Sequence, residues 1–393
     1  MEATLSSHSL SSSASNRLAW LDGHRGFIMI VMAIDHASAL VARKHPSEFW
    51  GVDMHVYDSG IAFLTRFITH ICAPGFFLLM GMGIFFLEEA RKKKGWTEGK
   101  ITSHLAIRGG ILLILQHIIE NPAWILGFSF ASPNVPQAVS PPGVLGPPMF
   151  VFGVITSLGL SMICLSIFRR LHWQAILALG VAVIVLSQLI VPGEENINVG
   201  YSFFARITAI PGMTAPVMVM YPLIPWLGVA LIGYVFAKWI QNDEKQAIQF
   251  SLPIGLGLIA IFFLIRIIGE FGNTHPFQSG DWMAFMNVTK YPPSIAYISW
   301  TLGLNFLILY AFYALGKNLH ERSPLIVFGQ SALFFYVIHL YLYAIIGSAF
   351  PDGTSFLIMY VLWAAGLLLL YPICQRYGRF KRTTAPGSVW RML

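Results

Sequence analysis

The sequence predicts an all-α membrane protein with about ten transmembrane helices and both termini in the cytosol. Three observations support this prediction. Of the 393 residues, 56% are hydrophobic and only 11% are charged, whereas a soluble domain carries about 25% charged residues. The hydrophobic residues gather in long stretches, and the basic residues lie in alternate connections between these stretches. This small number of charges cannot cover a water-exposed surface. A large part of the surface must therefore face lipid.

Each span needs roughly 20 apolar residues to cross the hydrocarbon core of a bilayer. In chain order the stretches that qualify are residues 26–42, 61–87, 107–119 (extended by 101–106), 149–168, 175–191, 217–239, 250–268, 295–315, 325–350 and 355–373. Residues 1–16 are serine-rich and lack an apolar core, so they resemble a disordered cytosolic tail rather than a cleaved signal peptide. We therefore expect one transmembrane domain over 17–382, followed by a second cytosolic tail over 383–393.

Basic residues indicate which connections face the cytosol. They follow the even-numbered spans as Arg91, Lys92, Lys93, Lys94 and Lys100, then Arg169 and Arg170, then Lys238 and Lys245, then Lys317 and Arg322. The connection over 121–148 has no Lys or Arg. This alternation follows the positive-inside rule, and it accounts for the net charge of +7 without a nucleic-acid partner. The three cysteines lie far apart in apolar stretches, and no metal site is expected.

Ionisable residues deep in a span are costly to bury and usually mark a functional site. Asp35 and His36 lie ten and eleven residues beyond Arg25, about 15 Å into the membrane at ~1.5 Å per residue. Because the two side chains project about 100° apart on a helix, Asp35 is expected to face a neighbouring helix, with Arg66 as its candidate partner. Arg66 and His70 share one helix face. The competing interpretation for each histidine is a structural contact between helices.

Two further spans carry ionisable residues of less certain depth. Arg108 is expected near the cytosolic end of the third span, whereas His117 and Glu120 lie near its outer end, where an interfacial position accounts for them. His339 in the ninth span reaches a depth comparable with that of His36. A lone histidine among aromatic residues is more often part of a core than of a catalytic site.

Four sequence blocks together resemble a known family. They are RLAWLDGHRGFIMIVMAIDH (17–36), YPLIPWLGVALIGY (221–234), KYPPSIAYISWTLG (290–303) and FGQSALFFYVIHLY (328–341). They occur in the order seen in the heparan-alpha-glucosaminide N-acetyltransferase catalytic-domain family, part of the transmembrane acyltransferase superfamily, and the chain looks like a bacterial-type member. The resemblance implies transfer of an acyl group, acetyl above all, from acyl-CoA to a glycan or other polar acceptor at the outer face.

The resemblance also suggests which histidine reacts. In the wider superfamily an arginine followed eleven residues later by a histidine marks the essential histidine, and this spacing maps to Arg25 and His36. In the lysosomal branch the active histidine instead follows a lysine in the next loop, and the nearest match, Lys44–His45, is about two residues out of register. His36 is favoured, with His45 as the alternative. An acyl-histidine intermediate and direct transfer are both compatible with this assignment.

The candidate site residues fall into three groups. The expected catalytic residues are His36, Asp35 and His45. The expected coenzyme-binding residues are Arg25, Arg108 and Arg66, although positive-inside topology alone also explains basic residues at the cytosolic face. The expected acceptor-binding residues are His70, His339, Lys290 and Tyr291. Acyl-CoA is then a co-substrate, no cofactor is tightly bound, and a homodimer is left open.

Two other function classes compete with acyl transfer. A solute transporter or exporter would also place charges inside a helix bundle, although the sequence has no evident inverted repeat. A haem-bearing electron carrier would use histidines such as His36, His70, His117 and His339 as axial ligands. The host membrane is expected to be the bacterial inner membrane, because the outer loops contain no convincing glycosylation acceptor beyond Asn287-Val-Thr.

Overall fold

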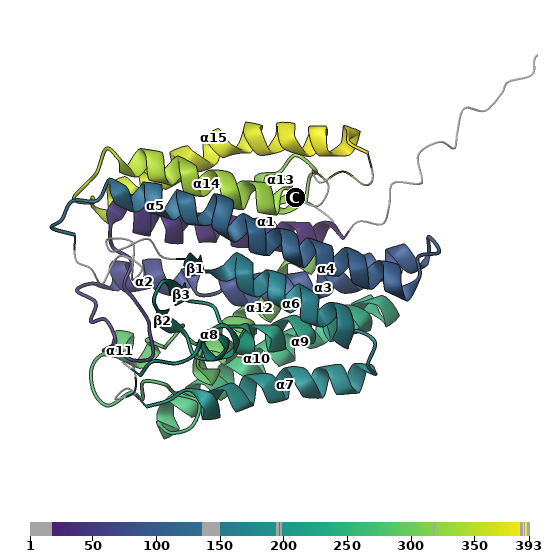
Figure 1. The fold of residues 1–393 in the computed structure, drawn as a ribbon, viewed down its shortest axis with the longest axis horizontal. Helices are drawn as coiled ribbons and strands as arrows, with labels where there is room; N and C mark the ends of the chain where they lie inside the picture. Colours follow the sequence, from purple (N-terminus) through teal and green to yellow (C-terminus); the bar gives the residue numbers. More distant parts are fainter. Residues whose placement is uncertain are drawn as a thin grey trace, which may run out of the picture.

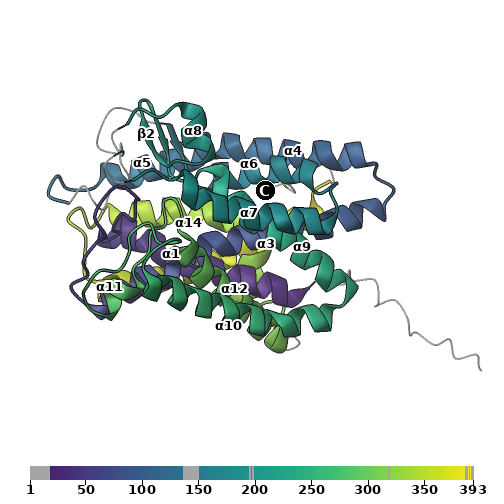
Figure 2. The ribbon, with the colours of Figure 1, turned by 90° about the horizontal axis from the view of Figure 1, so that it is seen from below.

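The protein forms a bundle of long helices, capped at one end by loops and a small sheet (Figures 1 and 2). The structure is a computed structural model, and it describes residues 18–135, 150–193, 196, 199–316, 319–385, 388 and 390. The tail expected over 1–16, and part of both the 121–148 connection and the 383–393 tail, lie outside the described residues. The predicted all-α, polytopic membrane fold is confirmed.

The helices follow one another with few interruptions. In chain order they are α1 (Ala19–Ala37), η1 (Ser38–Ala42), α2 (Gly60–Thr69), α3 (Cys72–Lys92), α4 (Glu98–Leu115), η2 (Gln116–Glu120), α5 (Asn121–Ser129), α6 (Val154–Phe168), α7 (Trp173–Ile190), α8 (Phe203–Thr208), α9 (Leu223–Asn242), α10 (Glu244–Ile268), α11 (Trp282–Met286), α12 (Ile295–Gly316), α13 (Pro324–Gln330), α14 (Ala332–Gly347) and α15 (Phe356–Thr383). The segments η1 and η2 are π-helical. The N-terminus of α1 and the C-terminus of α15 lie at the same end of the bundle (Figure 1).

Among the described residues, eight helical runs are long and apolar enough to cross a membrane. The bent pair α13 and α14 makes a ninth if it counts as one span, and its axes meet at 100°. The shorter α6 has 15 residues, so at ~1.5 Å per residue it covers about 22 Å of a ~30 Å core. All ten expected spans therefore contain a helix. Two of them differ from a full straight crossing, because α13–α14 is bent and α6 is short.

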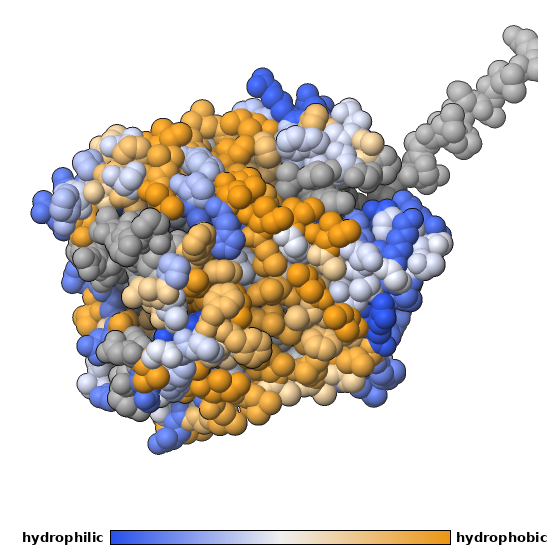
Figure 3. Space-filling view, in the orientation of Figure 1, coloured by the Kyte–Doolittle hydropathy of each residue, from blue (hydrophilic) through white to orange (hydrophobic). Residues whose placement is uncertain are grey.

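Polar side chains collect at the two ends of the bundle, and apolar side chains cover its middle on the face seen in Figure 3. Exposed apolar residues such as Leu189 (69% exposed) and Leu368 (76% exposed) belong to helices at the edge of the bundle. Because water would penalise this apolar belt, the exposed side chains are those that face lipid.

A three-stranded sheet lies towards the end of the bundle opposite the start of α1 (Figure 1). Its central strand β3 (Val217–Val219) pairs in parallel with β1 (Phe150–Phe152) and antiparallel with β2 (Gly212–Thr214). The first residues of the expected sixth span therefore form a strand, and α9 begins only at Leu223, immediately after Pro222. Proline has no backbone N–H to donate, and a residue at the start of a helix has no intrahelical acceptor for one, so Pro222 is compatible with this position.

Helices α3 and α9 pack so closely that glycines face backbone atoms of the partner helix. A β-carbon at Gly81 would collide with the carbonyl oxygen of Ala230, and one at Gly233 would collide with the carbonyl oxygen of Leu78. Small residues permit this approach, and close packing is a main source of helix association in lipid. The α3–α9 contact therefore holds the centre of the bundle together.

We expect Gly81→Ala to destabilise the protein by about 1–3 kcal/mol, because the added methyl group overpacks a backbone contact. Thermal unfolding in detergent measures the effect. Gly83→Ala is the matched control, since a β-carbon at Gly83 meets no atom within 4 Å. An unfolding temperature for Gly81→Ala equal to that of Gly83→Ala would contradict the α3–α9 packing.

Candidate functional site

Helix α1 presents two adjacent ionisable residues to two different neighbours. Asp35 is 8% exposed and contacts Arg66 on α2, whereas His36 is 8% exposed and contacts His339 on α14. The expected Asp35–Arg66 contact is therefore present, and Asp35 faces away from His36 because consecutive helical residues project about 100° apart. The site thus has two parts, one on each side of α1.

A chain of hydrogen bonds assigns the tautomers of the two histidines. Nδ1 of His339 lies 2.9 Å from the carbonyl oxygen of Phe335, which can only accept, so Nδ1 carries the proton and Nε2 is the acceptor. Nδ1 of His36 lies 2.6 Å from this Nε2 and must donate to it. A neutral His36 then has an unprotonated Nε2, which is the nitrogen able to accept a proton or attack a carbonyl carbon.

Two aromatic side chains stand edge-on to the His36 ring. The ring centroids of Trp124 and Tyr336 lie 5.2 Å and 6.0 Å from that of His36. Both aromatic side chains donate hydrogen bonds to the carboxylate of Glu120. Glu120 is only 4% exposed, so its side chain is buried between helices of the bundle. It is the last residue of the π-helical segment η2.

On the other side of α1, Arg66 joins two buried carboxylates. Its Nη1 lies 2.6 Å from Oδ1 of Asp35, while Nε and Nη2 lie 3.0 and 2.5 Å from the two carboxylate oxygens of Glu48. His70 adds a contact of 2.7 Å between its Nε2 and Oε1 of Glu48. Two parallel arginine–carboxylate bonds combine charge with fixed geometry. We call Asp35, Glu48, Arg66, His45 and His70 the outer cluster.

Glu48 is the centre of the outer cluster and was not among the residues expected from the sequence. Burial raises the pKa of Glu48, but the charge of Arg66 and the contact with His70 outweigh burial and lower the pKa to about 2. Glu48 therefore stays ionised at neutral pH. It comes from the loop after α1, where no periodicity or motif distinguishes it from other loop carboxylates. Its proximity to Lys44–His45 was the only available signal.

His45 occupies a position between a donor and an acceptor. Its Nε2 lies 3.0 Å from Nη1 of Arg66 and 3.2 Å from Oδ1 of Asp35. Arginine can only donate and a carboxylate can only accept, so an unprotonated Nε2 bonds to Arg66 and a protonated one bonds to Asp35. The His45 side chain is 18% exposed, the largest exposure among the cluster histidines and carboxylates. It is therefore the most accessible of these side chains.

Lys290 and Tyr291 form part of the wall of the outer cluster. Their backbone N–H groups donate to the carbonyl oxygen of Glu48, at 3.2 and 3.1 Å. They are 4% and 5% exposed, so they lie behind the cluster rather than on the rim of an open mouth. The hydroxyl groups of Tyr291 and Tyr221 are 3.4 Å apart. The sequence could not show this burial, because both residues lie in a loop.

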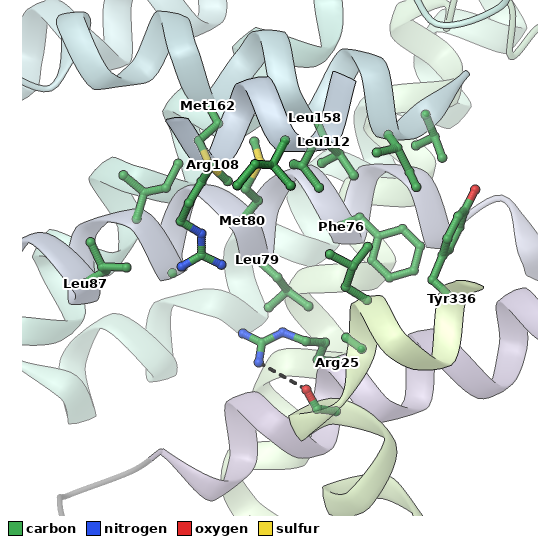
Figure 4. A pocket seen from close by; sticks show the side chains of 18 of the residues that line it. Arg25, Phe76, Leu79, Met80, Leu87, Arg108, Leu112, Leu158, Met162 and Tyr336 are labelled. Carbon is green, nitrogen blue, oxygen red and sulfur yellow. Dashed lines mark hydrogen bonds between the residues drawn. The ribbon is translucent and has the colours of Figure 1, made fainter. Parts of the chain in front are cut away.

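A cavity of about 340 Å³ lies on the His36 side of α1, between α1, α3, α4, α6, α13, α14 and the end of α15, which contributes Lys381. Arg25 and Arg108 line it near one end, and Tyr336 lines it near the other (Figure 4). Between these ends the wall is mostly apolar, with Phe76 and Met80 among its residues. Tyr336 thus stands between the cavity and the histidine pair.

The structure separates the three arginines expected to bind the coenzyme. Arg25 and Arg108 share the cavity, but Arg66 does not line it. The guanidinium of Arg66 is 3% exposed and is fully engaged by Asp35, Glu48 and His45. The expectation for Arg66 is therefore corrected: α2 places it in the outer cluster, on the opposite side of α1. His339 likewise lies against His36 rather than in the outer cluster.

Comparison with known proteins identifies a family. The family model described as "Heparan-alpha-glucosaminide N-acetyltransferase, catalytic" matches residues 17–269. The matched region contains His36, the whole outer cluster and both cavity arginines, whereas His339 and Lys290 follow it. No curated protein matches the chain.

Proposed function

The chain belongs to the heparan-alpha-glucosaminide N-acetyltransferase catalytic family and is a membrane-embedded transferase, and from this premise we propose that it moves an acyl group from acyl-CoA to a polar acceptor. The proposed acyl group is acetyl, and the proposed acceptor is an amine or hydroxyl of a glycan or similar small molecule. The observation that carries the proposal is the hydrogen-bonded chain from Phe335 through His339 to Nδ1 of His36, which leaves Nε2 of a neutral His36 unprotonated. Tyr336, which lines the cavity, packs against this imidazole.

The cavity suits the donor. Coenzyme A carries phosphates at one end and a slender thioester arm at the other. Arg25 and Arg108 supply positive charge at the end of the cavity expected to face the cytosol, and guanidinium groups bind phosphate by charge-assisted hydrogen bonds. The apolar wall accommodates the arm, whose thioester end then points towards Tyr336 and the histidine pair.

The proposed reaction balances in either of two ways. In direct transfer, the acceptor N–H or O–H gives its proton to Nε2 of His36 as the acceptor attacks the thioester carbon. The C–S bond breaks, and the CoA thiolate takes the proton. In the two-step route, Nε2 attacks the thioester carbon first, the C–S bond breaks and the thiolate leaves. The acceptor then attacks the acylimidazole carbon, the C–N bond to Nε2 breaks, and the acceptor proton passes to the thiolate. His339 stabilises the positive charge that develops on His36, because it accepts the Nδ1 proton.

The outer cluster is the proposed acceptor site. Its carboxylates and imidazoles match the hydroxyl and amino groups of a sugar, and His45 is its most accessible histidine. A bacterial inner membrane is the proposed location. Asn287, whose sequence context matches a glycosylation acceptor, is 6% exposed and donates to the carbonyl oxygen of His55, which supports this location.

Acyl transfer is tested with purified protein in lipid nanodiscs, using acyl-CoA labelled in its acyl group and a panel of amino sugars and sugar alcohols. Labelled acceptor, with release of free thiol in equal amount, supports the proposal. A protein that releases no thiol with any acceptor, yet moves solute across proteoliposomes, would establish the transporter alternative instead.

We expect Arg108→Ala to raise KM for acyl-CoA by about 10-fold or more with little change in kcat, because a charge-assisted hydrogen bond contributes roughly 1.5–3 kcal/mol. The same variant should use acyl-pantetheine, which lacks the nucleotide phosphates, as well as the wild type does. Arg170→Ala is the control, since Arg170 is an exposed arginine outside the cavity. Equal KM values for Arg108→Ala and the wild type would remove Arg108 from the coenzyme site.

A further inference from the structure

We propose that Glu120 is a positioning residue for His36, acting through the two aromatic side chains that flank the imidazole. This inference rests on the proposed function, because it assigns Glu120 a role in the same acyl-transfer site. Among the described residues, Glu120 forms hydrogen bonds to Trp124 and Tyr336 and none to His36. It acts by holding Trp124 and Tyr336 in place.

Both aromatic side chains bond to the same carboxylate oxygen. The hydroxyl of Tyr336 lies 2.8 Å from Oε1 of Glu120, and Nε1 of Trp124 lies 3.3 Å from this same atom. The three residues come from different places in the chain, since Glu120 ends η2, Trp124 lies one turn later in α5, and Tyr336 lies in α14. One carboxylate therefore ties α14 to the η2–α5 segment beside His36.

These contacts determine the orientation of the His36 ring. The planes of Trp124 and Tyr336 make angles of 89° and 82° with the imidazole, so both pack edge-to-face with it. The hydrogen bond to His339 holds Nδ1. With these three neighbours in place, the direction of Nε2 is fixed, and aromatic pairs of this geometry are stabilising beyond the area they bury. A reacting nitrogen must be held this way, because a displacement of about 1 Å can lower a rate ~10²-fold.

The surroundings of Glu120 show that its position is itself fixed. In the same π-helical segment, the Gln116 side chain accepts from the backbone N–H of Thr156 at 3.3 Å and donates to Oδ1 of Asn121 at 2.9 Å. These bonds connect η2 to the start of α6, so the backbone that carries Glu120 is braced. Oε2 of Glu120 is buried and has no hydrogen-bond partner in the part of the chain that the structure describes. Oε1 alone therefore carries the positioning contacts.

The decisive experiment compares Glu120→Ala, Glu120→Gln and Tyr336→Phe in the transfer assay. We expect Glu120→Ala to lower kcat by about 10- to 100-fold while KM for acyl-CoA changes less than ~3-fold. Glu120→Gln retains an acceptor oxygen and should restore most of the activity. Glu120→Ala and Tyr336→Phe disrupt one bond, so their effects on log kcat should be less than additive in the double variant.

The matched control is Glu244→Ala, because Glu244 also accepts an indole hydrogen bond, from Trp20 at 3.0 Å, away from the cavity. It should retain wild-type kcat. If the wild type is active and Glu120→Ala has the same kcat, the inference is overturned. It is also overturned if Glu120→Ala changes only KM. If Glu120→Ala does not fold, full activity of Tyr336→Phe overturns it as well. Absence of transfer by the wild type overturns the proposed function before any variant is compared.

Discussion

His36→Ala should lower kcat for acyl transfer by about 10²- to 10⁴-fold and still fold, because positioned proton transfer by a side chain contributes an effect of this size. The substitution removes the imidazole whose Nδ1 is held by a hydrogen-bonded chain from Phe335 through His339, which leaves its Nε2 free. Labelled acyl transfer in nanodiscs gives kcat, and thermal unfolding in detergent reports the fold. His339→Ala should have a smaller effect, because it leaves Nε2 of His36 in place.

His45→Ala distinguishes the two histidines that the family resemblance leaves in competition. If His36→Ala keeps its turnover and His45→Ala is inactive, the reacting histidine belongs to the outer cluster. If both variants stay active, the histidine mechanism is wrong. Loss in His36→Ala alone supports the mechanism, and KM values measured for His45→Ala then report whether the outer cluster binds the acceptor.

Arg66→Ala should destabilise the protein by about 3–5 kcal/mol, because it leaves two buried carboxylates without their cation. Asp35 and Glu48 are 8% and 1% exposed, so water cannot replace the guanidinium. Arg66→Lys should recover only part of the loss, since an ammonium cannot form both bonds to Glu48 at once. Thermal unfolding at neutral pH in detergent measures all three proteins.

A second variant, in which the whole ion-pair cluster is neutral, distinguishes two causes of the lost stability in Arg66→Ala: an unpaired buried charge and lost side-chain packing. The triple variant Arg66→Met, Asp35→Asn and Glu48→Gln should be more stable than Arg66→Ala, because no buried charge is left unpaired. The control Arg170→Ala removes an exposed arginine and should change stability by less than about 0.5 kcal/mol. An Arg66→Ala protein that unfolds at the wild-type temperature would show that the outer cluster does not hold the site together.

The two parts of the site explain why catalysis and stability should respond to different residues. Removing His36 takes away a reactive nitrogen but leaves the charges of the outer cluster balanced. Removing Arg66 disturbs that balance across α1, α2 and the Glu48 loop. Glu120 belongs to the first part, since its contacts reach Trp124 and Tyr336 rather than the outer cluster.

Several site features were predictable because they depend on local spacing. A helix of 3.6 residues per turn places Asp35 and His36 on different faces, so the Asp35–Arg66 contact followed from the sequence. The place of His339 within an apolar span was also evident from the sequence. Its partner was not, because His36 and His339 are 303 residues apart and helix packing alone brings them together.

Other features depended on irregular backbone that sequence patterns do not encode. The end of the third span, which includes Glu120, is the π-helical segment η2, and a count of i and i+3 positions assumes a regular α-helix. The α13–α14 bend at Ser331 and the strands around Val217 likewise interrupt apolar stretches that looked continuous. Apolar composition measures which segments avoid water, and it does not distinguish a straight helix from a broken one.

The sequence by itself determined that this protein is a helical membrane protein, which segments are apolar enough to cross, and that His36 belongs to one of these segments. These properties follow from the cost of placing each residue in water or in lipid, which is a local quantity. The tertiary structure alone decided that Glu48 completes the outer cluster, that Arg66 lies apart from the two cavity arginines, and that Tyr336 stands beside the cavity. Those contacts depend on how distant helices pack, and no local preference specifies that.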